Sequence, residues 1–148
     1  MTGYGRAGQT DTFFMSNIAP MTPSFNRSIW KNLESLIARN YSNNFEEVWV
    51  VTGPIYDDEI QRLATGVEIA DAFFKIVIDE VDGDPRAQAF VISQSRRSGS
   101  NLVNYITSID EVEKVTGLDI FGELPDDIED KIEAKVSPSI WTSDLTNK

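Results

Sequence analysis

The sequence contains neither cysteine nor histidine. Without cysteine, the chain cannot form disulfides, thiolate metal sites or cysteine nucleophiles. Without histidine, it lacks the side chain whose ordinary pKa lies nearest to neutral pH and which most often serves as a general base in enzymes. The composition therefore excludes every mechanism that needs an imidazole or a thiolate of this chain.

Long apolar runs and a secretory leader are also absent. The longest apolar candidate, residues 72–78, is interrupted by Lys75 and falls far short of the ~18 residues of a membrane-spanning helix. The first residues lack the apolar stretch of a signal peptide. We therefore expect no membrane segment and no secretory address, and the cellular compartment stays open.

Basic side chains are scarce relative to acidic ones. The chain has 13 Lys and Arg against 24 Asp and Glu, a net charge of −11. Residues 1–39 hold four basic and two acidic side chains, whereas residues 79–148 hold seven basic and fifteen acidic ones. This balance argues against a protein that coats duplex DNA, because Lys and Arg make most phosphate contacts. The acidic C-terminal part is typical of a solvated surface.

Length and composition predict one folded domain. The 148 residues suffice for a single core, and 41% hydrophobic with 25% charged residues is an ordinary globular balance. No repeat, low-complexity tract or linker divides the chain. We expect residues 1–148 to form a single domain that ends in an acidic helix and tail over residues 123–148.

A helix is predicted over residues 27–41. Its apolar side chains have the spacing of one buried stripe, formed by Ile29, Trp30, Leu33, Leu36 and Ile37. Pro20, Pro23 and Ser24 predict an irregular loop before it. Asn26 stands where the helix would begin, and asparagine at that position commonly caps the free backbone N–H groups.

Strands are predicted over residues 12–17, 47–52, 67–69, 72–78 and 88–93. The run 47–52 is almost wholly apolar, so we expect a central strand that is covered on both faces and closed by Gly53 and Pro54. Residues 82–85 (Asp-Gly-Asp-Pro) are a turn signal, so the last two strands are expected to pair as a hairpin.

The C-terminal third predicts one extended segment and two helices. Residues 102–107 favour a short strand or extended segment. Ser108 and Glu111 have the spacing of a capping box at the start of a short helix that ends at Gly117. A last helix is expected over residues 124–136. The whole pattern indicates an α+β fold, in which a mainly antiparallel sheet packs with a few helices.

A series of short motifs follows one another along the chain. Residues 12–20 (Thr-Phe-Phe-Met-Ser-Asn-Ile-Ala-Pro), 25–27 (Phe-Asn-Arg) and 30–34 (Trp-Lys-Asn-Leu-Glu) come first. Further strings lie at residues 50–55, 72–75, 89–91 and 110–118. In this order they closely resemble the DNA/RNA non-specific endonucleases of the ββα-metal group, over roughly residues 10–122.

The resemblance implies an incomplete ββα-metal fold and a phosphodiesterase that uses a single Mg²⁺ or Mn²⁺ ion. It implies that Asn26 is the one protein ligand of the metal, that Glu34 holds a metal-bound water, and that Asn17 helps to shape the site. Waters suit the other positions, because Mg²⁺ loses its hydration shell reluctantly. Eight helical residues separate Asn26 from Glu34 by about 12 Å and ~80° of rotation, which agrees with a contact through water.

The implied partners are DNA and RNA, bound without sequence preference, and a homodimer is compatible with the resemblance. Taken one at a time, the same residues have ordinary explanations. Asn26 would be a helix cap and Glu34 a solvent-facing helix residue, while Arg96 and Arg97 would either touch phosphate or belong to a solvated loop. Only the combination of motifs favours the metal-site role of Asn26 and Glu34.

The sequence departs from the family pattern at the general base. The family carries an Asp-Arg-Gly-His motif upstream of the first matching strand, and this chain has no histidine. Residues 3–8 (Gly-Tyr-Gly-Arg-Ala-Gly) match that motif only faintly, with Gly8 in the place of the histidine. Met21 replaces a glutamine, and Ala38 stands where the family has an arginine, with Arg39 next to it.

Three functions follow as hypotheses. The first is a Mg²⁺-dependent, sugar-non-specific endonuclease domain that keeps the metal-site helix and is impaired by the missing base, unless another chain supplies it. Unperturbed carboxylates, with a pKa near ~4, would be poor substitutes for that base. The second is an inactive pseudo-nuclease that binds a partner or nucleic acid, and the third is a structural remnant. Whether the chain is an enzyme thus depends on whether a general base comes from another residue or from another chain.

Overall fold

The computed structural model describes residues 18–45, 47–95 and 101–141. The predicted strand 12–17, together with Asn17, Arg96 and Arg97, lies outside the described residues. The elements run in the order α2 (Pro23–Phe25), η2 (Asn26–Trp30), α3 (Lys31–Leu36), η3 (Ile37–Tyr41), α4 (Ser42–Asn44), β1 (Trp49–Ile55), β2 (Gln61–Arg62), β3 (Glu68–Ile69), β4 (Ala72–Val81), β5 (Asp84–Ser93), η4 (Leu102–Tyr105), β6 (Ile106–Thr107), α5 (Ile109–Thr116) and α6 (Asp126–Glu133).

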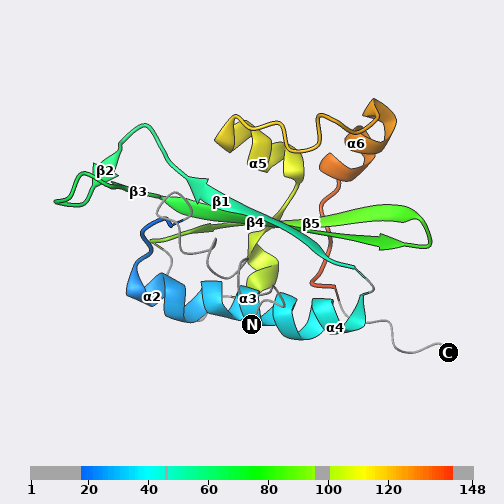
Figure 1. The fold of residues 1–148 in the computed structure, drawn as a ribbon, viewed down its shortest axis with the longest axis horizontal. Helices are drawn as coiled ribbons and strands as arrows, with labels where there is room; N and C mark the ends of the chain where they lie inside the picture. The colour runs from blue at the N-terminus through cyan, green and yellow to red at the C-terminus, as the bar shows by residue number, and fades with distance from the viewer. Residues whose placement is uncertain (1–17, 46, 96–100, 142–148) are drawn as a thin grey trace, which may run out of the picture.

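The elements form three layers around an antiparallel sheet. The sheet has four strands in the order β1-β4-β5-β6. One continuous helical segment, α2 to α4, covers one face, and α5 with α6 covers the other (Figure 1). A two-stranded ribbon of β2 and β3 extends from one end. The α+β class with an antiparallel sheet is therefore confirmed, and none of the described helices is long and apolar enough to cross a membrane.

The long helical segment begins earlier than expected. Thr22 is its N-cap, with a side chain that accepts a hydrogen bond from the Phe25 N–H, and Pro23 occupies the first turn. Proline suits this position because its fixed φ matches the helix and it has no N–H to satisfy. Asn26 lies inside the helix and donates its backbone N–H to the Thr22 carbonyl at 3.0 Å. The interpretation of Asn26 as the helix cap is therefore wrong.

The predicted apolar stripe of this helix is confirmed as core. Trp30 and Leu33 are buried and pack over the sheet. The rings of Phe25, Trp30 and Phe73 lie with their centroids 5.5–5.6 Å apart, which fixes the start of the helix over β4. Two stretches, η2 and η3, are π-helical, and such turns occur frequently at functional sites.

The sheet divides its side chains between two cores. Alternate residues of a strand point to opposite faces, so Phe73 and Val77 of β4 join the core under the long helix, while Phe74 and Ile76 join the core under α5 and α6. The β4–β5 hairpin is confirmed, and it extends to a tight turn at Asp82 and Gly83. Both turn residues have positive φ, 55° and 84°, as a hairpin turn of type I′ requires.

Among the described residues, the first strand of the sheet lies at its edge and is largely exposed, so the prediction of a central strand that is covered on both faces is wrong. Trp49 is 62% exposed, and its neighbours in β1 are exposed as well. The strand also continues through Gly53 and Pro54 to Ile55, instead of ending at them. An edge strand tolerates proline, because no second neighbour needs its missing N–H. The apolar run at 47–52 indicated strand formation but not its place in the sheet.

The C-terminal part agrees with its capping signals. The Ser108 hydroxyl accepts a hydrogen bond from the Glu111 N–H, and Gly117 ends α5 with a left-handed φ of 71°. The segment 102–107 was expected to be extended, but only its last two residues form a strand, β6, because the first four form the short helix η4. The last helix ends at Glu133, short of the expected residue 136.

Candidate active site

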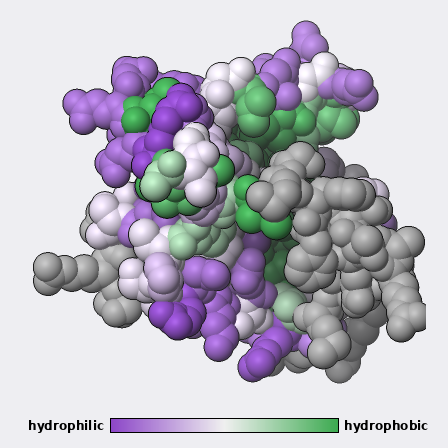
Figure 2. Space-filling model, turned by 60° about the vertical axis from the view of Figure 1, so that its left-hand side comes forward, coloured by the Kyte–Doolittle hydropathy of each residue, from purple (hydrophilic) through white to green (hydrophobic). Residues whose placement is uncertain are grey.

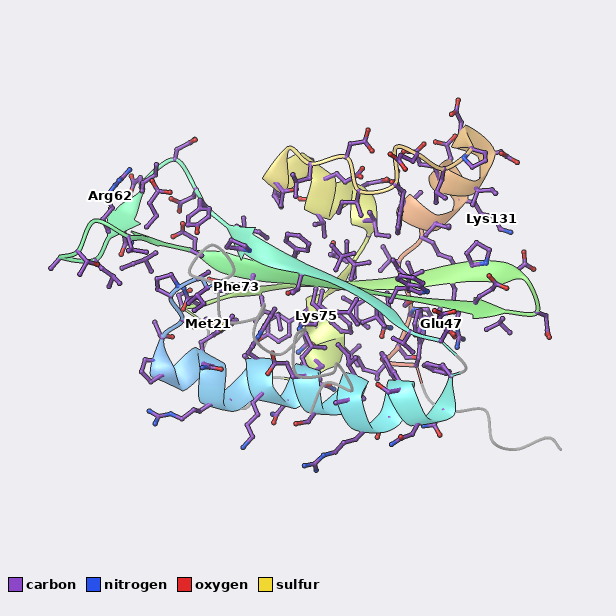
Figure 3. The ribbon with its side chains drawn as sticks, in the orientation of Figure 1. Met21, Glu47, Arg62, Phe73, Lys75 and Lys131 are labelled. Carbon is purple, nitrogen blue, oxygen red and sulfur yellow. The ribbon has the colours of Figure 1, made fainter. Side chains whose placement is uncertain are left out.

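A cavity of about 310 Å³ opens where the long helix meets β1 and β4. The helix contributes Trp30 and Glu34 to its lining, β4 contributes Phe73 and Lys75, and β1 contributes Gly53. Figure 3 shows Lys75 and Phe73 in the layer between the sheet and the helix, with Met21 nearby. The corresponding end of the molecule presents apolar residues in the middle of its surface, between polar residues above and below (Figure 2).

The polar centre of the cavity is an ion pair between the sheet and the helix. Lys75 Nζ lies 3.9 Å from Glu34 Oε1 and 4.7 Å from the centroid of the Trp30 ring. The Lys75 side chain is 8% exposed, whereas that of Glu34 is 52% exposed. One charge is therefore nearly withdrawn from water and the other faces solvent at the mouth of the cavity.

Strand periodicity places Lys75 in this buried position. It lies two residues from Phe73 and from Val77, both of which face the long helix, so its side chain points the same way. Burial lowers the pKa of the Lys75 ammonium below its usual value, and the charge of Glu34 partly offsets that effect. The cavity therefore holds a nearly buried ammonium group beside a half-exposed carboxylate.

The wall formed by β1 depends on a glycine. Gly53 lies opposite Phe74 in the antiparallel register, and a Cβ atom on Gly53 would lie 2.7 Å from the Phe74 ring. The neighbouring Thr52 donates its hydroxyl to the Phe74 carbonyl at 2.9 Å. The close approach of β1 to β4 at the cavity therefore needs a residue without a side chain at position 53.

The entrance to the helix is held in place by Gln94. Its amide group donates to the Ala70 carbonyl at 2.6 Å and to the Pro20 carbonyl at 3.2 Å, while its oxygen accepts from the Thr22 N–H at 2.6 Å. These contacts fasten the segment before the helix to the end of β5. The first helical turn, which carries Asn26, is thereby positioned relative to the sheet.

The structure brings together only part of the predicted site. Glu34 lines the cavity, and so does Ile18, the residue that follows Asn17. Asn26 is exposed in η2 and is not among the residues that line the cavity. Its side-chain amide makes no hydrogen bond to another residue of the described part of the chain, so its oxygen is free to bind a ligand from solvent.

Sequence reasoning missed Lys75 and Gln94 as parts of this site. Lys75 was noted as a break in an apolar run and as the last residue of the string 72–75, but no role was assigned to it. A single charge inside a strand of otherwise apolar residues is itself a signal, because a buried ammonium needs a partner. No comparable signal marks Gln94, since its three partners come together only in the folded chain.

Asn26 and Glu34 have the donor chemistry of a hydrated Mg²⁺ site. An amide oxygen and a carboxylate are hard oxygen ligands, and both side chains are exposed to solvent. A Mg²⁺ ion that keeps most of its waters needs few direct protein ligands and tolerates such exposure. The residues present therefore fit this ion.

Comparisons with known proteins give one consistent result. The family model for DNA/RNA non-specific endonucleases matches residues 2–127. The chain is 30% identical to a nuclease of Serratia marcescens over 132 residues, which cover 82% of the chain and 48% of the relative. It is 26% identical to human mitochondrial endonuclease G over 128 residues, which cover 78% of the chain and 43% of the relative.

The fold also has a relative among solved structures. A crystal structure of an EndoG/EndoGI complex aligns with a TM-score of 0.65 and 23% identity, covering 78% of this chain and 53% of the other. This likeness supports the shared fold. The chain spans about half the length of the relatives that it matches.

Proposed function

The chain belongs to the DNA/RNA non-specific endonuclease family, and from this premise we propose that it carries the metal-site half of a Mg²⁺-dependent nuclease. The proposed reaction is hydrolysis of phosphodiester bonds in DNA and RNA without sequence preference. The observation that carries the proposal is the family match over residues 2–127. The cavity with Glu34 and Lys75 supports a location for the site.

We assign the metal to Asn26 and Glu34. Asn26 would offer its amide oxygen directly to one Mg²⁺ or Mn²⁺ ion, and Glu34 would hold one of the waters around it. Once bound, the ion would polarise a phosphate and stabilise the departing oxygen. The π-helical turn that contains Asn26 supports this assignment, because such turns are frequent at functional sites.

The buried lysine completes the proposed site. Lys75 orients the Glu34 carboxylate across the mouth of the cavity and adds positive charge where a phosphate oxygen would lie. Three exposed basic residues, Arg27, Lys31 and Arg39, occupy the same helical segment. A polyanion would therefore approach from the side of the long helix, despite the net charge of −11.

The proposed nuclease is slow because it lacks a base. A positioned general base typically contributes ~10²–10⁴-fold to a rate, and no histidine is present to supply it. This absence also favours a second candidate function, a pseudo-nuclease that binds nucleic acid without cutting it. The two candidates predict the same binding but different cleavage.

A plasmid-nicking assay with Mg²⁺ separates these functions. We expect the wild-type chain to nick no faster than Asn26→Ala, while Mg²⁺ titration still distinguishes the two proteins by calorimetry. Asn32→Ala is the matched control, since Asn32 is exposed on the same helix. Rapid nicking that Asn26→Ala and Glu34→Ala abolish would disprove the impairment. Identical metal titrations of wild type and Asn26→Ala would remove Asn26 from the metal site.

We extend the proposal to assembly as a homodimer. The edge strand β1 is the surface that we assign to it, because its outer backbone groups have no neighbouring strand in the described sheet and its side chains Trp49, Val50 and Val51 are exposed. Strand edges of this kind pair readily with another chain.

A further inference from the structure

A second cluster of polar groups lies on the other side of the sheet from the cavity, between α5 and α6. It consists of Asp110 and Glu113 of α5 and Glu133 of α6, each with one carboxylate oxygen within 4.8 Å of the other two. Glu133 is the unusual member. It is 7% exposed, and its Oε1 atom is buried without a hydrogen-bond partner in the described part of the chain.

The charges of this cluster are not balanced by nearby cations. Within residues 18–45, 47–95 and 101–141, no lysine or arginine forms an ion pair with the three carboxylates. Lys114 pairs with Glu111, and Lys131 pairs with Asp84. Burying a carboxylate beside two others is unfavourable unless a positive species joins them. The geometry thus calls for an occupant with positive charge.

We propose that Asp110, Glu113 and Glu133 bind one divalent cation of the Ca²⁺ type, in a structural site that fastens α5 to α6. The ligands are carboxylate oxygens only, which hard cations prefer. Ca²⁺ accepts irregular carboxylate arrangements with oxygens at ~2.3–2.6 Å, so one ion can bridge oxygens within 4.8 Å of one another. Mg²⁺ needs a shorter and more regular octahedron.

The folded chain already preorganises two of these ligands. Glu113 accepts the Ile120 N–H at 2.6 Å through Oε1, which holds its carboxylate against the loop after α5. Glu133 is held by its burial at the end of α6, where Ile132 packs into the core under these helices. Asp110 is exposed and opens the site to solvent, so an ion can enter without unfolding.

A proton is the competing occupant. Burial, next the charges of Glu113, Glu129 and Asp110, and last a hydrogen bond with the Glu113 side chain raise the pKa of Glu133 to about 7. Binding should therefore be measured at pH 8, where Glu133 is mostly ionised. This cation site contains neither Asn26 nor Glu34, so it does not depend on the proposed nuclease function.

The test is calorimetric titration with Ca²⁺ at pH 8, together with thermal unfolding in EDTA and in Ca²⁺. We expect one binding site in the wild type and a rise in Tm of about 3 °C or more when Ca²⁺ stands tenfold above its Kd. Glu133→Gln should lose at least tenfold in affinity, yet unfold at a higher Tm than wild type in EDTA, because it removes the buried charge. A variant that merely failed to fold would not show this rise.

Three comparisons complete the experiment. Asp110→Asn should also weaken Ca²⁺ binding, whereas Glu123→Gln, an exposed glutamate in the loop between the helices, should bind as wild type does. Asn26→Ala should keep the Ca²⁺ response, which separates this site from the proposed nuclease centre. Equal titrations of wild type and Glu133→Gln, or a Tm that responds to acid but not to Ca²⁺ at pH 8, would overturn the proposal.

Discussion

Lys75 at the cavity is both buried and charged, two properties that rarely occur together in one side chain. Lys75 is almost completely buried, which disfavours its charge, but in the described part of the chain it pairs with one carboxylate only, and that carboxylate is half exposed. An arrangement optimised for stability alone would place an apolar side chain there, since well-packed apolar replacements of buried ions are often neutral or stabilising. We therefore propose a binding role for Lys75.

The substitution Lys75→Met tests this role. Methionine fills a similar volume without the desolvation of an ammonium, so we expect an unfolding free energy within about 1 kcal/mol of wild type or above it. Binding of a labelled oligonucleotide should weaken roughly 10–100-fold, the usual effect of losing a contact with a charged group. Urea unfolding and fluorescence anisotropy measure the two quantities. Lys114→Met, at an exposed lysine of α5 on the opposite side of the sheet, is the control, and equal binding by both variants would contradict the role.

Tyr41 joins the helix, the sheet and the C-terminal segment. Its hydroxyl donates to Gln88 Oε1 at 2.6 Å and accepts the Trp141 N–H at 3.3 Å. Burial raises the pKa of Tyr41 to about 12, although the Trp141 N–H and the charge of Arg86 act in the opposite direction. Because the folded pKa exceeds the ordinary value of 10, this contribution to stability is present below pH 10 and is lost as the pH rises towards 12.

Alkaline titration of phenolate absorbance should therefore show one tyrosine that ionises late, near pH 12. Tyr41→Phe should remove that late phase and lower the unfolding free energy at neutral pH by about 1–3 kcal/mol, because Gln88 Oε1 loses its donor. Tyr56→Phe is the control, since Tyr56 is 39% exposed. A late phase that persists in Tyr41→Phe would assign it to another residue.

The site could be predicted from sequence only where a motif carried it. Glu34 was identified through the string that contains it, and it lines the cavity. The roles of Glu34, Asn26 and Asn17 at a metal ion all stay predictions. Lys75 belongs to the string 72–75, but its contact with Glu34 became visible only in the fold, because the distance between positions 34 and 75 depends on how the strands and the helix pack.

For helices and strands, local sequence signals predicted where an element begins and ends better than they predicted its position in the sheet. Ser108 and Gly117 bound α5 as expected, because a cap is a contact between near neighbours in sequence. The edge position of β1 was missed, because an apolar run predicts a strand but does not tell which strands will lie beside it. Pro54 was the available signal, since proline within a strand favours an edge.

The exposed β1 edge has a testable consequence for assembly. We expect the wild type to form a dimer in multi-angle light scattering, and Val50→Lys to shift it to the monomer, since lysine on an edge strand opposes strand pairing. Val115→Lys, which places lysine at an exposed valine of α5, should leave the mass unchanged. A monomeric wild type, or equal masses for both variants, would contradict the assignment of β1. Circular dichroism confirms that the folds are intact.

In the whole molecule, basic and acidic side chains are distributed unequally over the helices on the two sides of the sheet. The long helix carries the exposed basic residues Arg27, Lys31 and Arg39, while α5 and α6, on the opposite side of the sheet, carry eight of the 24 acidic residues. Net charge alone therefore underestimates how well the helix side could receive a polyanion. The fold class followed from the sequence because periodicity and turns report it, whereas this division depends on how the layers assemble.

Because the sequence has no histidine, adding a base from solution tests whether the rest of the proposed site is assembled. If the metal-site residues are assembled and only a base is missing, a diffusible base should restore part of the activity. Free imidazole has a pKa near ~7 and is small enough for the cavity of about 310 Å³. We expect it to raise Mg²⁺-dependent nicking at least about tenfold, a fraction of the ~10²–10⁴-fold that a positioned base supplies.

The pH profile and one variant show whether such rescue occurs at this site. The rescued rate should increase with pH through the pKa of imidazole and then level off, because only the neutral ring accepts a proton. Asn26→Ala should show no rescue, while Asn32→Ala should respond as the wild type does. Equal stimulation of all three proteins would place the effect in solution. No stimulation of the wild type would favour the pseudo-nuclease, because the remaining residues would then lack the arrangement that a base needs to act.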